Sequence, residues 1–246
     1  MQHRLHVDIL PQPDQTTCGP TCLHAVYRYY DDEQELGEVI ARAPRLAEGG
    51  TLAVMLGCDA LRRGYRVSVY TYNLRVFDPT WFREPAVDLA QRLRLQRAAK
   101  AGDERLEVAT DAYLEFLALG GRVRWADLSA DLLRRYLKRG VPILTGLSST
   151  YLYQEAREVP PTDRPDDVEG VPAGHFVVLS GYDKESRTVR IADPLADNPV
   201  AALHHYSVPT GRVVNAILLG VLTHDANFLI VEPPGGGATK RSSKTP

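Results

Sequence analysis

The chain has 246 residues, of which 44% are hydrophobic and 24% are charged, and its formal net charge is −2. This composition is typical of an ordinary soluble globular protein, and the length allows one large domain or two small ones. Because positive and negative charges nearly balance, the chain has no basic field that would attract nucleic acid or an anionic membrane surface. We therefore expect neither of these partners.

The sequence contains no stretch typical of a membrane span or a secretion signal. The N-terminal apolar run includes Arg4 and Asp8, and the longest later run, residues 216–222, is far too short to span a bilayer. The three cysteines do not make a disulfide framework, and a reducing compartment suits a free thiol. These features predict a cytoplasmic protein.

The N-terminal part is predicted to contain a strand, several helices and a second strand. Residues 5–10 alternate enough to be a short strand, and two prolines then keep the chain extended up to Cys18. From Cys18 to about residue 30, apolar side chains recur at helical spacing. The elements predicted next are two helices and a strand, over residues 36–43, 52–63 and 65–72.

The middle of the chain is predicted to be an insertion. Residues 79–119 have a helical pattern rich in Arg, Leu and Ala, interrupted near residues 101–103. We interpret these helices as added material or a lid within a single domain that covers residues 1–232. Residues 233–246 are rich in glycine and polar side chains, cannot bury apolar area, and are predicted to be a disordered tail.

The C-terminal half is predicted to be mostly sheet. A short strand at residues 122–125 precedes a helix that Ser129 caps and that runs to about residue 138. Residues 154–172 hold many acids and prolines, which describes a mobile surface loop that stops just before His175. The remaining predicted strands cover residues 141–145, 176–182, 187–192, 204–208 and 227–232.

Cys18 is the candidate nucleophile. It stands at the start of an apolar helix, where unsatisfied backbone N–H groups and the positive end of the helix dipole favour the thiolate. Gln12 lies six residues upstream, and its amide, together with the Cys18 N–H, can donate to the oxyanion of a tetrahedral intermediate. Gln15 is a competing donor for the same role.

His175 and Asp193 are the candidate partners of this thiol. If the turn after Tyr182 closes a simple antiparallel hairpin, Asp193 falls almost opposite Val177, diagonal to His175 on the same face. Asp193 would then orient an imidazole that takes the proton from the thiol and later donates it to the leaving group. Asp183 is a rival acid, although its place in the hairpin turn explains it.

The other cysteines have a simpler interpretation. Cys22 and Cys58 lie on apolar faces of predicted helices, so we expect both to pack in the core. A metal site of Cys18 and Cys22 with His175 or His205 would lack the second closely spaced ligand pair of the usual zinc pattern. We predict no metal and no cofactor.

Together, these motifs resemble those of papain-like cysteine peptidases of family 39, a group that includes bacteriocin leader-processing peptidases. The shared features are Gln12 six before Cys18, Cys-Gly-Pro at residues 18–20, Gly-His-Phe-Val-Val at residues 174–178, and Ala-Asp-Pro at residues 192–194. The resemblance implies an α+β papain-like fold, with the cysteine in an N-terminal helical half and the histidine and aspartate in a C-terminal antiparallel sheet half. Since leader-processing members are usually fused to transporters and this chain has no membrane span or nucleotide-binding loop, it looks like a free-standing relative.

The predicted function is that of a cysteine peptidase or amidohydrolase, which cleaves a peptide or amide bond through an acyl-Cys18 intermediate. The predicted catalytic residues are Cys18, His175, Asp193 and Gln12, and the expected partner is a peptide or protein substrate. Two alternatives keep the same fold: a catalytically silent peptide-binding protein, and an acyltransferase in which an amine displaces the thiol. The sequence specifies no oligomeric state.

Overall fold

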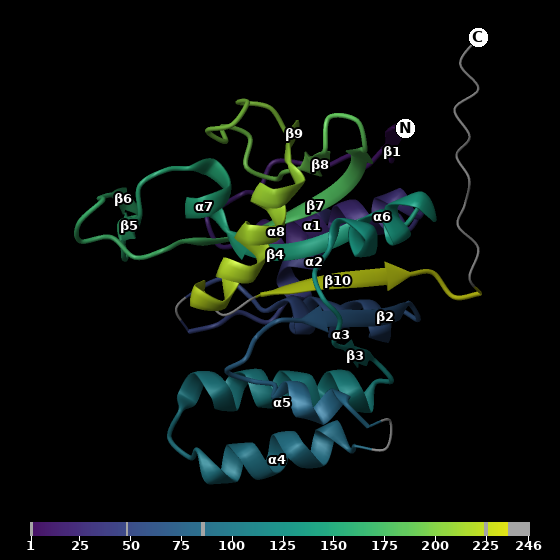
Figure 1. Cartoon of the computed structure of the whole chain (residues 1–246), viewed down its shortest axis with the longest axis vertical. Coiled ribbons are helices and arrows are strands. Elements are labelled where there is room, and N and C mark those ends of the chain that lie inside the picture. The colour runs from purple at the N-terminus through teal and green to yellow at the C-terminus, as the bar shows by residue number, and fades with distance from the viewer. Residues whose placement is uncertain (1, 48, 85–86, 224–225, 236–246) are drawn as a thin grey trace.

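The structure, a computed structural model, describes residues 2–47, 49–84, 87–223 and 226–235. Within these ranges one eight-stranded sheet carries helices on both faces (Figure 1). In sheet order the strands are β3 (Arg122–Arg124), β2 (Arg66–Thr71), β10 (Asn227–Glu232), β4 (Ile143–Ser148), β7 (Gly174–Asp183), β8 (Thr188–Ala192) and β9 (His205–Pro209), and β1 (Gln2–Arg4) pairs with β7. Strands β2 and β3 are parallel, and the other neighbouring strands run antiparallel.

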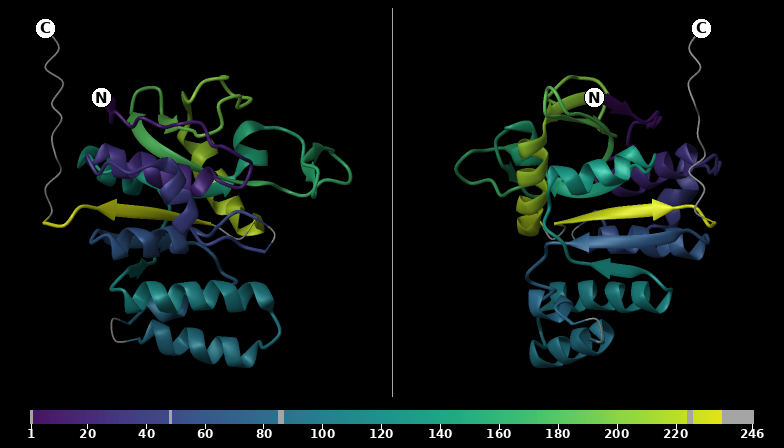
Figure 2. Two further views of the ribbon diagram at one scale, coloured as in Figure 1. Left: turned by 180° about the vertical axis from the view of Figure 1, so that it is seen from behind. Right: turned by 45° about the vertical axis from the view of Figure 1, so that its right-hand side comes forward.

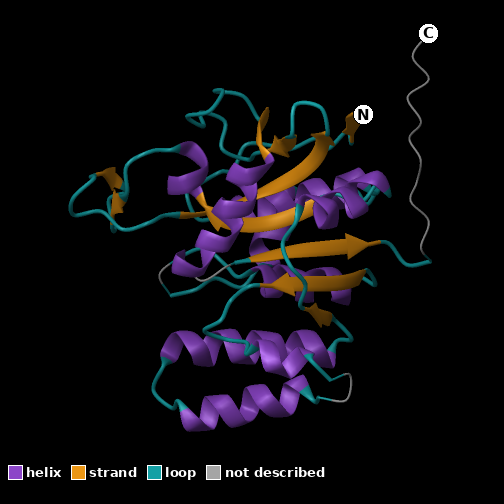
Figure 3. Cartoon of the chain, in the orientation of Figure 1, coloured by secondary structure: helices purple, strands orange, loops and turns teal. Residues whose placement is uncertain are grey.

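The described helices are α1 (Cys18–Tyr29), α2 (Leu36–Arg42), α3 (Ala53–Arg62), α4 (Leu89–Ala99), α5 (Glu104–Ala118), α6 (Ala130–Lys138), α7 (Ser149–Tyr153) and α8 (Thr210–Leu219), with short 3₁₀ turns η1 (Pro79–Phe82) and η2 (Gly220–Thr223). Helices α6 and α8 cover one face of the sheet, and α1 and α3 cover the other (Figures 1 and 2). The α+β class predicted from the sequence is confirmed (Figure 3). No helix in the described ranges is long and apolar enough to cross a bilayer.

The helix predicted to begin at Cys18 lies in the core of the protein. Every residue of α1 from position 18 to position 27 is buried, because the helix packs against β7, α2 and α3. A helix surrounded in this way holds its N-terminus in a fixed place. Its first turn points to the end of β7 that carries His175, which brings the two predicted halves of the site together.

Helices α4 and α5 lie outside the β3 edge of the sheet (Figures 1 and 2). Helix α5 packs against α3, whereas α4 packs mainly on α5 and buries only Leu93. Their N-termini are capped by Asp88 and Asp103, whose side chains accept from backbone N–H groups in the first turns. The interpretation of residues 79–119 as an insertion stays a prediction, and residues 236–246 of the predicted tail lie outside the described residues.

The strand predicted over residues 5–10 is wrong. The described strand β1 covers residues 2–4, and the Leu5 N–H donates one further hydrogen bond to β7, to the Ser180 carbonyl at 2.7 Å. The alternation along this segment has another cause. Leu5, Val7 and Ile9 are buried and the residues between them are more exposed, because an extended segment lies across the core without pairing as a strand.

Two further differences from the prediction concern the C-terminal half. Strand β4 begins two residues later than expected, because the Val141 N–H donates to the Tyr136 carbonyl and so belongs to the end of α6. Helix α8 was not predicted. It buries Val213, Ala216 and Ile217 at helical spacing, but its glycine and β-branched residues are poor helix formers.

Residues 154–172 form a surface loop with a small sheet of its own. Strand β5 (Glu158–Val159) pairs with β6 (Arg164–Pro165), and Asp166 accepts backbone N–H groups from Val168 and Glu169. The predicted surface position agrees with the exposure of most of these residues. The loop connects α7 to the start of β7 and therefore leads directly into the site.

Candidate active site

Cys18 is the first residue of α1, and its side chain is only 7% exposed. The turn before it is closed by Thr17, whose hydroxyl donates to the Asp14 carbonyl and accepts from the Asp14 N–H. Among the described residues no side chain caps this helix, so its first backbone N–H groups and the positive end of its dipole act on Cys18. The structure therefore places Cys18 at a helix N-terminus, as the sequence predicts.

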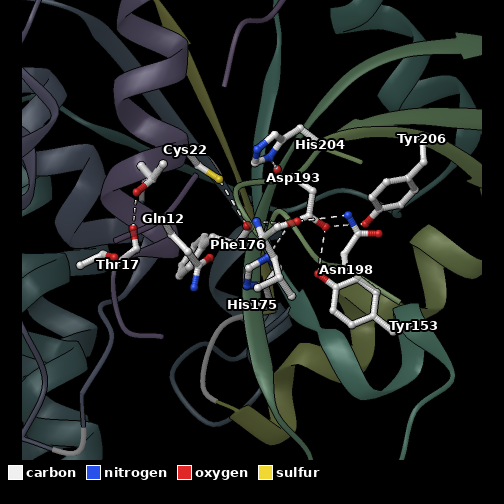
Figure 4. Close-up of polar contacts among 12 residues, drawn as sticks. Gln12, Thr17, Cys22, Tyr153, His175, Phe176, Asp193, Asn198, His204 and Tyr206 are labelled. Atoms are coloured by element: carbon white, nitrogen blue, oxygen red, sulfur yellow. Dashed lines mark hydrogen bonds and ion pairs between the residues drawn. The ribbon is translucent and has the colours of Figure 1, made fainter. Parts of the chain in front are cut away.

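The imidazole of His175 joins Cys18 to Asp193. His175 is the second residue of β7, and its side chain lies close enough to the Cys18 thiol to interact with it electrostatically. Its Nε2 lies 2.9 Å from Oδ1 of Asp193 (Figure 4). Since Nε2 is taken by the carboxylate, Nδ1 is the ring nitrogen left for the thiol. The structure thus brings together three of the four predicted site residues.

The electrostatics of the pair favour an imidazolium next to a carboxylate. Burial alone disfavours the charged imidazole, but the charge and hydrogen bond of Asp193, together with the interaction with Cys18, outweigh it and raise the pKa of His175 to about 10. Burial likewise opposes ionisation of Asp193, and His175 with the other donors around the carboxylate lowers its pKa. Each group therefore keeps the other charged.

A β-bulge sets the face on which Asp193 lies. Next to the turn, Gly181 pairs with Arg190, but after the bulge Val178 pairs with Ala192, so β7 has one residue more than β8 between these pairs. Asp193, one residue beyond Ala192, therefore falls opposite Val177 and on the face of His175, as the sequence expects. A ladder continued from the turn without the bulge would place Asp193 opposite Val178, on the other face.

Gln12 is held beside this site by its backbone. Its N–H donates to the Pro194 carbonyl at 3.0 Å, one residue after Asp193. Its side-chain Nε2 donates to the Asp14 carbonyl at 2.9 Å, and its Oε1 is buried without a hydrogen-bond partner among the described residues. A primary amide has two N–H groups, so an oxyanion would take the second one or replace the bond to Asp14.

The two rival residues have other positions. Gln15 is exposed on the turn before Cys18, whereas Gln12 is half-buried and tied to Pro194. Asp183 stands at the end of β7 opposite to His175, where its carboxylate accepts from the Glu185 N–H. The geometry favours Gln12 and Asp193.

Two tyrosines that the sequence analysis missed complete the surroundings of Asp193. The Oδ2 atom accepts from the hydroxyl of Tyr153 at 2.9 Å and from the hydroxyl of Tyr206 at 2.5 Å (Figure 4). Tyr206 carries a signal that the sequence offers, since its place in the predicted strand over residues 204–208 puts alternate residues on one face. Tyr153 belongs to α7, a short helix that the sequence pattern does not reveal.

Cys22 and Cys58 both lie in the core. Cys22 is fully buried one helical turn after Cys18, and its thiol donates to the Phe176 carbonyl at 3.2 Å. Burial, with the negative charges of Cys18 and Asp193, raises the pKa of Cys22 well above its ordinary value. Burial raises the pKa of Cys58 to about 12. Neither thiol is therefore placed to act as a nucleophile near neutral pH.

Comparisons with known proteins extend these observations. The sequence model of the Peptidase_C39 like family matches residues 99–208, which include His175 and Asp193 but not Cys18. A comparison with curated proteins gave no match. A protein described as a C39-like peptidase from Bacillus anthracis is similar in structure, with a TM-score of 0.51 and 15% sequence identity over 94% of this chain and 98% of that chain.

Two other solved structures are less similar. Xylellain, a cysteine protease from Xylella fastidiosa, has a TM-score of 0.47 and 16% identity over 94% of this chain and 85% of that chain. A double glycine motif protease from an AMS/PCAT transporter, in complex with the leader peptide, has a TM-score of 0.45 and 14% identity over 95% of this chain and 99% of that chain. The family match over residues 99–208 and the fold shared with the Bacillus anthracis protein both agree with the resemblance to family 39 found in the motifs.

Proposed function

We propose that the protein is a cysteine peptidase that cleaves a peptide bond through an acyl-Cys18 intermediate. The observation that carries this proposal is the placement of the Cys18 thiol near His175, whose Nε2 lies 2.9 Å from the buried carboxylate of Asp193. The match to the Peptidase_C39 like family supports it. A structural histidine would need neither the thiol at a helix N-terminus nor a buried acid on its far nitrogen.

The first half of the reaction forms the acyl-enzyme. In the resting site the Cys18 proton is held on Nδ1 of His175, and the thiolate attacks the substrate carbonyl carbon. The negative charge that develops on the carbonyl oxygen is stabilised by the Cys18 N–H and the Gln12 amide. When the C–N bond breaks, His175 gives its proton to the leaving amine, and the acyl group stays on sulfur.

The second half restores the enzyme. His175 takes a proton from a water molecule, whose oxygen attacks the thioester carbonyl, and the C–S bond of the resulting tetrahedral intermediate then breaks. A carboxylic acid is released, and the free thiolate again lies beside the imidazolium of His175. Asp193 remains ionised throughout and stabilises the imidazolium that forms in each half.

We infer a peptide or protein as the substrate, and the cytoplasmic location stays a prediction from the sequence. The net charge of −2 gives no reason to expect nucleic acid or an anionic membrane as a partner. We also infer that residues 79–119 are an insertion, since α4 and α5 lie outside the β3 edge of the sheet, whereas Cys18 and His175 belong to α1 and β7 (Figure 1).

The direct test is digestion of a peptide library by the wild-type chain, by Cys18→Ala and by Cys58→Ala, with mass spectrometry of the products. Cys58 is the matched control, because it is another buried helical cysteine outside the site. We expect new termini with the wild type and Cys58→Ala and none with Cys18→Ala. Cleavage that survives in Cys18→Ala would refute the proposal, and so would the absence of cleavage together with an unreactive Cys18.

A further inference from the structure

The carboxylate of Asp193 is completely buried and accepts hydrogen bonds at both oxygens. Oδ1 accepts from Nε2 of His175 and from the N–H of Leu195, both at 2.9 Å. Oδ2 faces away from the imidazole and accepts from the hydroxyls of Tyr153 and Tyr206. Among the described residues, these two phenols therefore supply all of the solvation that replaces water at Oδ2.

We propose that Tyr153 and Tyr206 are positioning residues that keep Asp193 ionised and aimed at His175, and that they thereby set the acid limit of the Cys18 thiolate. This inference rests on the proposed function, because it assigns a role within the same site. It concerns Oδ2, an atom that no reacting group touches. The two phenols act on catalysis only through Asp193 and His175.

Burying the charge of Asp193 costs free energy. A carboxylate removed from water takes up a proton unless donors replace its hydration. Hydrogen bonds from neutral hydroxyls stabilise the anion without adding a second charge next to the imidazolium. With both donors on Oδ2, the second oxygen is held in place, and the carboxylate cannot rotate away from Nε2 of His175 without losing them.

Both phenols keep their protons over the whole range in which the site works. Burial, together with the negative charge of Asp193, raises the pKa of Tyr153 and of Tyr206 far above the ordinary phenol value. Each hydroxyl is therefore a constant donor. The other titratable groups around Asp193 are His175 on β7, Cys18 and Cys22 on α1, and His204, whose Nδ1 lies 2.7 Å from the Asp193 carbonyl.

The tyrosines reach Asp193 from two separate elements. Tyr206 stands in β9 and is paired with Ile191 of β8, which places its ring on the face of the sheet that carries Asp193. Tyr153 is the last residue of α7, and its ring centroid lies 6.0 Å from that of His175. Tyr153 thus contacts both members of the ion pair, at the point where the loop of residues 154–172 begins.

The test measures the rate at which iodoacetamide alkylates Cys18 from about pH 4 to about pH 9, for the wild type, Tyr153→Phe and Tyr206→Phe. Peptide mapping assigns the label to Cys18. The acid limb of this pH–rate profile is the part in which the rate falls toward low pH. We expect it to move up by about one pH unit in each variant, because each loses one hydrogen bond to a buried anion. The rate on the alkaline plateau should stay within about twofold of the wild type, because the thiolate itself is unchanged.

Tyr30→Phe is the matched control. The Tyr30 hydroxyl is also partly buried and donates one hydrogen bond, to the Val231 carbonyl at 3.0 Å, but it lies outside the site. We expect its acid limb to coincide with that of the wild type. A fluorinated tyrosine at position 206 is a stronger donor of nearly equal size and should move the acid limb in the opposite direction, to lower pH. This variant still tests the proposal if a phenylalanine variant does not fold.

The outcomes separate this inference from the proposed function. An unactivated Cys18 in the wild type contradicts both. An activated Cys18 whose acid limb stays in place in Tyr153→Phe and Tyr206→Phe overturns the role of the tyrosines and leaves the proposed peptidase intact. An equal shift in Tyr30→Phe would also overturn it, because the effect would then come from a general loss of stability.

Discussion

The backbone N–H of Gln12 donates to the carbonyl of Pro194 at 3.0 Å, so the predicted oxyanion donor is fastened to the residue that follows the predicted orienting acid. This bond joins two segments that are far apart in the sequence, the one before α1 and the one after β8. It couples the position of the Gln12 amide to that of Asp193. A substitution that shifts one of these residues should therefore also shift the other.

Replacement of Gln12 by alanine should lower kcat for peptide cleavage by about a hundredfold to a thousandfold, the usual effect of losing one oxyanion donor. The rate of Cys18 alkylation by iodoacetamide should hardly change, because alkylation passes through no oxyanion. Gln15→Ala is the control, since Gln15 is exposed on the same turn, and it should retain full activity. Equal losses in both variants, or a loss of alkylation in Gln12→Ala, would remove Gln12 from the oxyanion role.

The ion pair should also make stability depend on pH in a defined way. The pKa of His175 is raised from 6.5 to about 10, so its contribution is complete below pH 6.5 and is lost as the pH rises toward 10. The pKa of Asp193 is lowered from 3.8, so its contribution is complete above pH 3.8 and is lost as the pH falls through the lower value. The two contributions overlap between these ordinary values.

We therefore expect the free energy of unfolding of the wild type to exceed that of His175→Gln most clearly between pH 3.8 and pH 6.5, with a difference that shrinks toward pH 10. Urea unfolding of both proteins at a series of pH values measures this difference directly. A difference that grows as the pH rises from 6.5 would contradict the assignment of a protonated His175 in the folded state.

Gly181 should be sensitive to substitution because the N-terminal strand lies directly against it. A Cβ atom at this position would stand 2.5 Å from the His3 carbonyl oxygen and 3.2 Å from the Arg4 Cα, both of which are backbone atoms. Gly181→Ala should therefore displace β1 and cost about 1–3 kcal/mol of stability. The midpoint of urea unfolding measures this cost.

Gly211→Ala is the matched control for this prediction. A Cβ atom added at Gly211, in the first turn of α8, meets no described atom within 4 Å apart from its chain neighbours and the backbone of its own helix. Alanine also favours helix over glycine by about 0.5–1 kcal/mol, so this variant should be at least as stable as the wild type. If both substitutions had the same effect, the contact between β1 and Gly181 would not determine the result.

Local signals in the sequence explain which elements could be predicted. The helix over residues 130–138 follows a serine whose side chain accepts from the Leu132 N–H, and the helix at Cys18 has clear apolar spacing. The segment over residues 5–10 shows the limit of such signals. Its alternation reflects burial of every second side chain, which is common to paired strands and to extended chain that crosses a core.

The sequence predicts those parts of the candidate site that depend on elements adjacent in the chain. His175 and Asp193 lie in neighbouring strands joined by one turn, so register and face could be argued from the sequence, although the bulge that sets the face could not. Tyr153 meets Asp193 only because α7 packs next to β7 and β4. Contacts of this kind depend on tertiary packing between distant elements and leave no periodic signal.

The central claim is that Cys18 is an activated thiol paired with His175. Its most direct test is the rate of alkylation of Cys18 by limiting iodoacetamide, followed by intact mass across the pH range, in the wild type and in His175→Ala. We predict fast labelling of one thiol in the wild type that persists at acid pH, and slower labelling that follows ordinary thiol titration without the imidazole. Labelling of the wild type that rises only near the ordinary thiol pKa of about 8.5 would contradict the proposal.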